Sequence, residues 1–118
     1  MIVYLLDVLK QLSIDEPIIV VGEGAELVRS ALAGYGVQFV LQREQLGTGH
    51  AVQCAVPLLE TRAGNVLVLY GDTPFAPREA LEQLFSECDQ GAAEALLTVE
   101  LEDPSGNGRI LRNTEGDV

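Results

Sequence analysis

The sequence predicts an α/β protein of the doubly wound class, in which a mostly parallel sheet carries helices on both faces. The first observation behind this is that helical and strand-like patterns alternate along the whole chain of 118 residues. The second is that the strand-like runs are apolar almost throughout, as in "IIVV" at Ile18–Val21, which is typical of strands covered on both faces. No internal repeat or linker divides the pattern, so we expect one domain over residues 1–118.

In the first third of the chain, apolar residues recur at helical spacing over residues 2–12 and 25–33, which predicts two helices. Between them, Asp15, Glu16 and Pro17 end the helical pattern before the strand at residues 18–21. Gly34 follows the second helix, and we expect it to end the helix by adopting the left-handed backbone conformation. The side chains expected to face inward are Ile2, Leu5, Leu6, Leu9 and Leu12 in the first helix and Leu27, Val28, Ala31 and Leu32 in the second.

The rest of the chain continues the alternation. Apolar runs predict strands at residues 37–41, 65–70 and 95–101, with helices at residues 49–59 and 77–88 between them. We expect Pro57 to shorten or bend the first of these helices, whereas Pro77 suits the first turn of the second. A turn-rich loop at residues 103–108 then leads to a short last strand at residues 110–111.

Composition narrows the function. The formal net charge is −11, from 18 acidic and 7 basic residues, which excludes a nucleic-acid or anionic-membrane surface because both need clustered Lys and Arg. Cys54 and Cys88 lack CxxC spacing, so they are expected to be buried free thiols in a reducing compartment. No signal-peptide pattern and no apolar run long enough to span a bilayer is present, so we expect a soluble, cytoplasmic protein.

Ligands of such sheets bind beyond the carboxyl ends of the strands, so the loops that follow the strands hold the candidate site residues. Gly22-Glu23-Gly24 starts like a dinucleotide fingerprint, but Leu27 occupies the third glycine position, which favours a simple acidic helix start. Gly47-Thr48-Gly49 lets backbone N–H groups approach a flat or phosphate-bearing ligand. It does not match a Walker loop, and an ordinary loop is the open alternative.

Asp72 follows the apolar run at residues 65–70, where a carboxylate can hold a Mg²⁺ that substrate phosphates complete. The alternative is that Asp72 caps the turn into Thr73-Pro74. His50 and Cys54 share a helical face at i, i+4, but the pair without further ligands is a weak metal signal, and the sequence names no partner for His50 as a base. The small residues of Gly106-Asn107-Gly108 let the backbone approach a ligand closely. The alternative is that they form an ordinary turn.

Three stretches in order carry a family resemblance: "LQREQLGTGHA" at residues 41–51, "VLVLYGD" at residues 66–72 and "LTVELEDPSGNGRI" at residues 97–110. They resemble the uridylyltransferase domain of bacterial N-acetylglucosamine-1-phosphate uridyltransferases, in the sugar-nucleotidyltransferase superfamily. The resemblance covers nearly all of the chain. It implies a nucleotide-diphospho-sugar transferase-like fold and a role in making a cell wall precursor.

The resemblance also implies roles for individual residues. Gln42 would pair with the uracil edge, and Gly47 and Thr48 would contact the base and ribose. Asp72 would be the catalytic residue that holds Mg²⁺. Tyr70 and Gly71 would flank that metal on the sugar side, and the backbone of Gly108 would approach the N-acetylglucosamine ring. The implied reaction is attack of the sugar 1-phosphate on the α-phosphorus of UTP, which gives UDP-N-acetylglucosamine and pyrophosphate.

The chain also departs from the family pattern. Family members open with a strand and a glycine-rich L-A-x-G-x-G-T-R-M loop that binds the triphosphate, and no such segment precedes Met1. The chain is therefore expected to be a truncated middle portion with little turnover alone, or alternatively a non-catalytic module for nucleotide-sugar binding or interaction. In the family, the first strand lies between the strands that correspond to residues 18–21 and 65–70. Without it, both of these strands would have an unpaired apolar edge. We therefore expect a homodimer or higher oligomer with residues 18–21 or the first helix at the interface.

Overall fold

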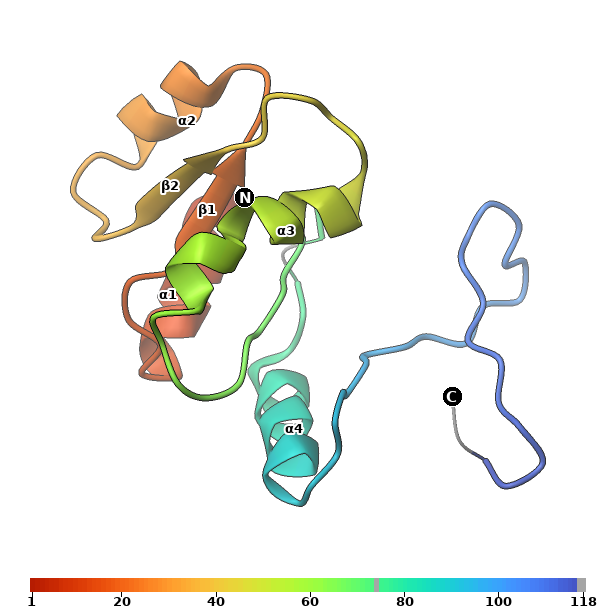
Figure 1. Cartoon of the computed structure of the whole chain (residues 1–118). Helices are drawn as coiled ribbons and strands as arrows, with labels where there is room; N and C mark the ends of the chain where they lie inside the picture. The colour runs from red at the N-terminus through yellow and green to blue at the C-terminus, as the bar shows by residue number, and fades with distance from the viewer. Residues whose placement is uncertain (74, 117–118) are drawn as a thin grey trace.

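The computed structural model describes residues 1–73 and 75–116, and Figure 1 shows the arrangement of its elements. Pro74, which the sequence placed in the turn after Asp72, lies outside the described residues. In chain order the elements are α1 (Ile2–Gln11), β1 (Ile18–Val21), α2 (Ala25–Ala31), β2 (Gln38–Leu41), α3 (Thr48–Leu59) and α4 (Arg78–Asp89). The α/β class is confirmed, and its helices and first two strands lie within a few residues of the predicted bounds.

The sheet is formed by β1 and β2, which run parallel with Ile18 opposite Gln38 and Val21 opposite Leu41. Beyond this register, Gln38 N donates to Pro17 O at 2.9 Å and Gln42 N donates to Val21 O at 2.8 Å. Odd-numbered β1 residues therefore turn their backbone groups toward β2, because a parallel ladder uses alternate residues. The backbone groups of Ile18 and Val20 lie on the opposite edge.

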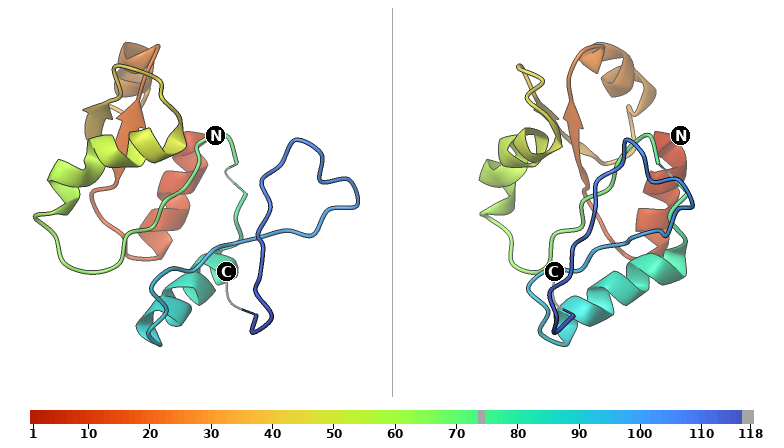
Figure 2. Two further views of the ribbon diagram at one scale, coloured as in Figure 1. Left: turned by 45° about the vertical axis from the view of Figure 1, so that its right-hand side comes forward. Right: turned by 90° about the vertical axis from the view of Figure 1, so that its right-hand side faces the viewer.

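The helices cover both faces of this short sheet. Figure 2 (right) shows α3 on one side of the strands and α1 on the other, with α2 on the same side as α1. α3 packs on both β1 and β2. Pro57 lies inside α3, which still reaches Leu59, so the expected shortening does not occur. In this arrangement α3 begins directly after the loop that follows β2. This loop lies at the carboxyl end of the strand, the edge of a parallel sheet at which ligands bind.

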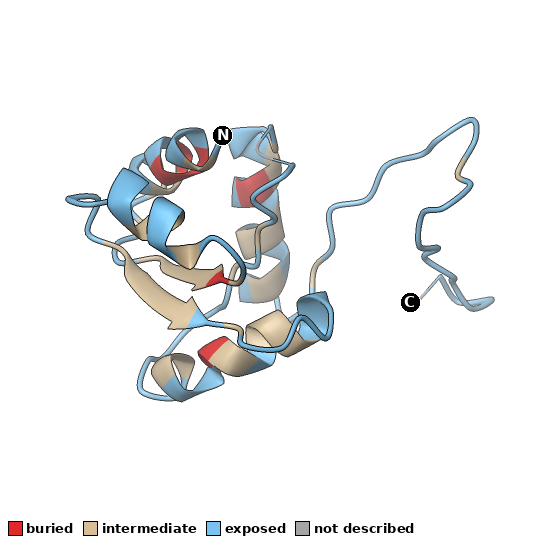
Figure 3. Cartoon of the chain, turned by 90° about the horizontal axis from the view of Figure 1, so that it is seen from above, coloured by how far each residue is buried: buried red, intermediate tan, exposed pale blue. Residues whose placement is uncertain are grey.

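The core lies between the helices and the strands, as the red segments in Figure 3 show. Its buried apolar residues are Leu5, Leu6, Val8, Val21, Leu32, Ala55 and Leu81. The inward face expected for α2 is partly wrong, because Leu27 is 78% exposed and Ala31 is also exposed. Val28 and Leu32 are spaced i, i+4 and share one helical face, whereas Leu27 lies on another. In so short a helix only one narrow face can reach the sheet.

The strands predicted at residues 65–70, 95–101 and 110–111 are wrong, because these described segments have no ladder partner. β1 is bonded to β2 on one edge, and residues 65–70 do not reach its other edge. An apolar run becomes a strand only where a neighbour accepts its hydrogen bonds. Residues 95–101 and 110–111 lie in the C-terminal segment that runs away from the helices and sheet in Figure 1.

A cavity of about 520 Å³ lies between β1 and residues 64–71. Apolar side chains of α1 and α3 form other parts of its wall, and among them are Leu5, Leu9, Ala51 and Val52. The space is a cleft rather than an enclosed void, since Val66, Val68 and Tyr70 in its wall are exposed. It separates the free edge of β1 from the apolar run that the sequence suggested as its companion strand.

Two further features of the described residues bear on the cellular setting. No helix among residues 1–73 and 75–116 combines the length and apolar character needed to cross a membrane. Cys54 and Cys88 are both free thiols, as expected, but each is half-buried rather than fully buried.

Candidate functional site

The loop between β2 and α3 places Gln42, Gly47 and Thr48 close together. Gln42 follows the last residue of β2, and Thr48 is the first residue of α3. Gly47 caps the helix with φ of 100° and ψ of 179°, a conformation open only to glycine. The first backbone N–H groups of α3 have no intrahelical acceptor, so the loop presents donors beside the Thr48 hydroxyl. The glycine that the sequence singled out is therefore required by the backbone.

The Gln42 side chain is held in a specific contact with this loop. Its Nε2 donates to Gly47 O at 3.0 Å, and it lies 3.1 Å from His50 Nδ1. On the far side of the ring, His50 Nε2 lies 3.8 Å from Cys54 Sγ. Gln42, His50 and Cys54 are each half-buried, so the chain of contacts is only partly open to water. It connects the end of β2 to the first two turns of α3.

From the sequence, His50 is half of a weak metal pair with Cys54, or a base whose partner cannot be named. The structure gives it two, because Gln42 comes from the preceding loop and Cys54 from the next turn of the same helix. The available signal was the spacing of Gln42 and His50 around the glycine turn. The two residues lie on opposite sides of a turn that interrupts both the strand and the helical pattern, so periodicity could not pair them.

Tyr70 ends the apolar run at residues 65–70, Gly71 and Asp72 follow it, and all three are exposed. Tyr70 and Gly71 line the same cavity as Thr48, so the structure brings these predicted site residues to one space. Asp72 lies in a turn in which Thr73 N donates to Tyr70 O at 3.3 Å. No hydrogen bond or ion pair is recorded for the Asp72 carboxylate itself among the described residues.

The donor set around Asp72 bears on whether it can hold a metal. Among residues 1–73 and 75–116, no three His, Cys, Asp or Glu side chains gather as a ready metal site. Mg²⁺ does not need such a cage, because it is commonly held by one or two carboxylates, waters and substrate phosphates. A single exposed carboxylate is therefore compatible with Mg²⁺ as one ligand of several.

Gly108 does not join the other predicted residues. It lies in the C-terminal segment, whose loop stands apart from the sheet and helices in Figure 1. That loop is ordered by local contacts, in which Ser105 N donates to Asp103 Oδ1 at 3.0 Å and Arg109 Nη1 donates to Pro104 O at 2.7 Å. The Ser105 side chain, and then its backbone N–H, lower the pKa of the exposed Asp103 carboxyl.

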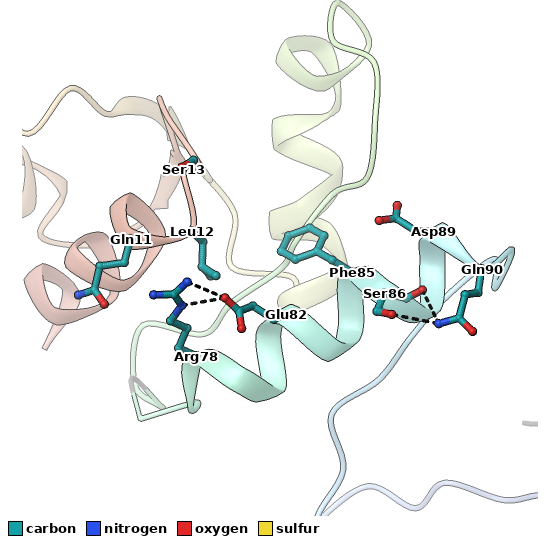
Figure 4. Close-up of a pocket in the computed structure, with 9 residues that line it drawn as sticks. All are labelled: Gln11, Leu12, Ser13, Arg78, Glu82, Phe85, Ser86, Asp89 and Gln90. Atoms are coloured by element: carbon teal, nitrogen blue, oxygen red, sulfur yellow. Dashed lines mark hydrogen bonds and ion pairs between the residues drawn. The ribbon is translucent and has the colours of Figure 1, made fainter.

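A second hollow of about 500 Å³ lies between the end of α1 and α4, as Figure 4 shows. Four of its polar residues already bind one another in two pairs. Arg78 Nη2 is 2.7 Å from Glu82 Oε1, and Gln90 Nε2 donates to Ser86 Oγ at 3.0 Å. None of the predicted site residues lines it. We therefore place the candidate site at the β2–α3 loop and the larger cavity.

Comparison with known proteins places the chain among nucleotide-transferring proteins. The family model for the MobA-like NTP transferase domain matches residues 1–105. The chain is 47% identical over 118 residues to the bifunctional protein GlmU of Paraburkholderia phytofirmans, covering 100% of this chain and 26% of that protein. GlmU of Marinobacter nauticus is 46% identical over 118 residues, again covering 100% of this chain and 26% of that protein.

The chain thus spans about a quarter of the length of the curated relatives that it matches. The resemblance inferred from the three sequence motifs is confirmed by these matches. The α/β architecture, with its parallel sheet and helices, agrees with this family. The chain belongs to the MobA-like NTP transferase domain family.

Proposed function

We propose that this chain is a portion of a uridylyltransferase that binds a uridine nucleotide and a sugar phosphate. The observation that carries the proposal is the shared location of the candidate residues. Gln42 and Gly47 are hydrogen-bonded in one loop, and Thr48 lines the same cavity as Tyr70 and Gly71. In this proposal Gln42 forms hydrogen bonds with the uracil edge, and Gly47 and Thr48 at the start of α3 contact the base and ribose. The sugar phosphate binds beside Tyr70 and Gly71.

The proposed reaction joins UTP and N-acetylglucosamine 1-phosphate. An oxygen of the sugar phosphate attacks the α-phosphorus of UTP, the bond to the β-phosphate bridge breaks, and pyrophosphate leaves. Asp72 would hold Mg²⁺, which when bound neutralises phosphate charge. The protein's own residues supply orientation, because this chemistry needs no covalent nucleophile. A cytoplasmic setting with its nucleotide pools, and the free thiols of Cys54 and Cys88, agree with this proposal.

Binding tests the proposal directly. Isothermal titration with UDP-N-acetylglucosamine should give measurable heat with the unmodified chain. Gly47→Val should abolish the binding, because the φ of 100° at Gly47 strains any side chain. Gly34→Val is the matched control, since Gly34 also has positive φ but lies outside the β2–α3 loop and does not line the cavity. Equal affinity in the chain and in Gly47→Val would contradict the loop assignment.

Turnover should be near background for this chain alone. Triphosphate charge needs compensating donors, and the chain carries only 7 basic against 18 acidic residues. A pyrophosphate-release assay with UTP, N-acetylglucosamine 1-phosphate and Mg²⁺ measures this. Release at a typical enzyme rate of about 10 per second that Asp72→Ala abolishes would show that the chain is a complete catalyst.

A second candidate function is a non-catalytic module that binds nucleotide sugar or a protein partner. The free edge of β1 at the cavity favours it, since the backbone groups of Ile18 and Val20 face away from β2. An unpaired apolar edge is a template for another strand. Binding of UDP-N-acetylglucosamine without turnover, even in mixtures with longer relatives, would distinguish this module from a catalytic portion.

The same edge leads us to propose a homodimer or higher oligomer, with Ile18–Val21 or α1 at the interface. A second copy supplies suitable material, because residues 95–101 are apolar except for Thr98 and Glu100 and have no ladder partner, and residues 96–101 are exposed, with Val99 75% exposed. Inserting this run beside β1 would satisfy both sets of backbone groups. In this proposal the strand that pairs with the free edge of β1 is therefore the 95–101 segment of another copy.

Light scattering measures the assembly, for which a monomer weighs 12.7 kDa. Val99→Lys should reduce the mass to that of a monomer, because burying a lysine against the apolar side chains of β1 is costly. Leu111→Lys is the matched control, since Leu111 is 79% exposed but lies outside the proposed strand. A monomeric unmodified chain, or equal effects of the two variants, would contradict the assembly.

A further inference from the structure

The loop that carries Asp72 is joined to α1 by a pair of aromatic rings. The ring centroids of Tyr4 and Phe75 lie 5.8 Å apart with 52° between the ring planes, a tilted arrangement that aromatic pairs favour. Tyr4 lies in the first turn of α1, and Phe75 lies between Asp72 and the start of α4. In both views of Figure 2, the chain around residues 70–73 passes beside the N-terminus, where α1 begins.

Few polar contacts hold this loop in place. Thr73 N donates to Tyr70 O at 3.3 Å, a bond within the loop itself. No hydrogen bond or ion pair is recorded between the described residues 71–73, 75 and 76 and the sheet or the helices α1 to α3. Because the Asp72 carboxylate also has no recorded partner among the described residues, its position depends on the loop backbone. That backbone depends in turn on the aromatic pair.

The exposure of the two rings shows that their contact adds little to the core. Tyr4 is 49% exposed and Phe75 is 78% exposed. On α1, Ile2 and Leu5 line the larger cavity, and Gly71 of the loop lines it too. The aromatic pair therefore joins two segments that both border the candidate site.

We infer that Tyr4 is a positioning residue that holds the Asp72 loop, through Phe75, where the carboxylate can bind Mg²⁺ together with the phosphates of a nucleotide sugar. The inference rests on the proposed nucleotide-sugar binding and adds to it the residues that place the metal ligand. Tyr4 itself need not touch the metal or the nucleotide sugar. A ligand on a loop is held less precisely than one on a helix, so contact with α1 gives this loop the support of a rigid element.

The first experiment needs no ligand. ¹⁵N relaxation measures the order of the Asp72 and Thr73 backbone amides in the free chain. Their order parameters should fall from about 0.8 in the unmodified chain to below about 0.6 in Tyr4→Ala and in Phe75→Ala. Tyr4→Phe keeps the ring and should keep the order. Tyr35→Ala is the matched control and should leave the loop unchanged, because Tyr35 is 45% exposed but lies outside the aromatic pair.

The second experiment measures the Kd for UDP-N-acetylglucosamine by isothermal titration, once with Mg²⁺ and once with EDTA. Tyr4→Ala should raise the Kd about two- to tenfold in Mg²⁺, the factor that an aromatic pair supplies, and should leave it unchanged in EDTA. Tyr4→Phe should restore the unmodified value. A double variant with Tyr4→Ala and Phe75→Ala should bind no more weakly than either single variant, because both rings act through one contact.

The outcomes separate this inference from the function on which it rests. If the unmodified chain does not bind UDP-N-acetylglucosamine in Mg²⁺, the proposed function fails, and the metal-positioning role fails with it. If the chain binds but the Asp72 amide is equally ordered in Tyr4→Ala, the proposed function stands and the role of Tyr4 is wrong. An equal loss of affinity in Mg²⁺ and in EDTA indicates a merely structural tyrosine and also overturns the inference.

Discussion

β1 and residues 66–70 are two apolar runs of similar composition that line the same cavity. Both are followed by a glycine, Gly22 after β1 and Gly71 after residues 66–70. β1 pairs with β2, and Val21 at its end is buried. Residues 66–70 pair with nothing described, and Val68 is 49% exposed. The difference shows that a second edge within reach, rather than composition, decides whether an apolar run becomes a strand.

The C-terminal segment extends the same comparison. Leu97 is 55% and Val99 75% exposed in a run that the sequence also marks as a strand. Without a neighbouring edge, this run can neither bond its backbone to a ladder nor bury its side chains. The layered region from α1 to α3 therefore holds most of the stabilising contacts of the described chain.

The largest expected contrast is in hydrogen exchange. The amides of Ile19 and Val21 face β2 and should exchange at least about a hundredfold more slowly than those of Leu67 and Val68, because they open only with the sheet. Within β1, the amides of Ile18 and Val20, which face away from β2, should exchange faster than those of Ile19 and Val21. Exchange measured by NMR checks this. Similar protection in both runs would mean that residues 66–70 are paired in solution.

A matched pair of truncations tests the contribution of burial. Val21→Ala should lower the free energy of unfolding by about 2 kcal/mol, because two buried carbons and their contacts are lost. Val68→Ala removes the same atoms from an exposed position and should change it by less than about 0.5 kcal/mol. Urea denaturation of both variants gives the comparison. If the two losses are equal, residues 66–70 are as buried as β1.

Limited proteolysis compares the layered region with the C-terminal segment. Trypsin should cleave after Arg109 and Arg112 about tenfold faster than after Arg29 in α2, because cleavage needs local opening and the C-terminal segment is already exposed. Mass spectrometry of the early fragments shows the order of the cuts. Cleavage at Arg29 first would indicate that the sheet region is the less stable of the two.

The smallest expected effect concerns local order in the C-terminal segment. Hydrogen bonds from Ser105 lower the pKa of Asp103 from its ordinary 3.8, so the turn is stabilised above that pH and loses this support as pH falls through the lower folded pKa. NMR titration of the carboxyl checks the direction. Ser105→Ala should raise the pKa toward its ordinary value, and an unchanged pKa would mean that the turn is not formed in solution.

Several local features follow from the sequence alone. The helical spacing of apolar residues predicted α1 and α4 within a residue or two, and the β-branched run predicted β1 at its observed bounds. Gly34 and Gly47 have the positive φ that only glycine adopts readily, so their places in turns could be predicted. The motif around Gln42, Gly47 and Thr48 pointed to the family that the comparisons confirm.

The tertiary structure alone decided which runs pair and which side chains meet. Residues 65–70 and 95–101 have the composition of strands, but pairing depends on an edge that lies far away in sequence. The contact of Gln42 with His50 depends on how the β2–α3 loop turns around Gly47, which no periodic pattern records. Local conformation is set by neighbouring residues in the chain, whereas ladders, cavities and side-chain contacts are set by what the rest of the fold brings within reach.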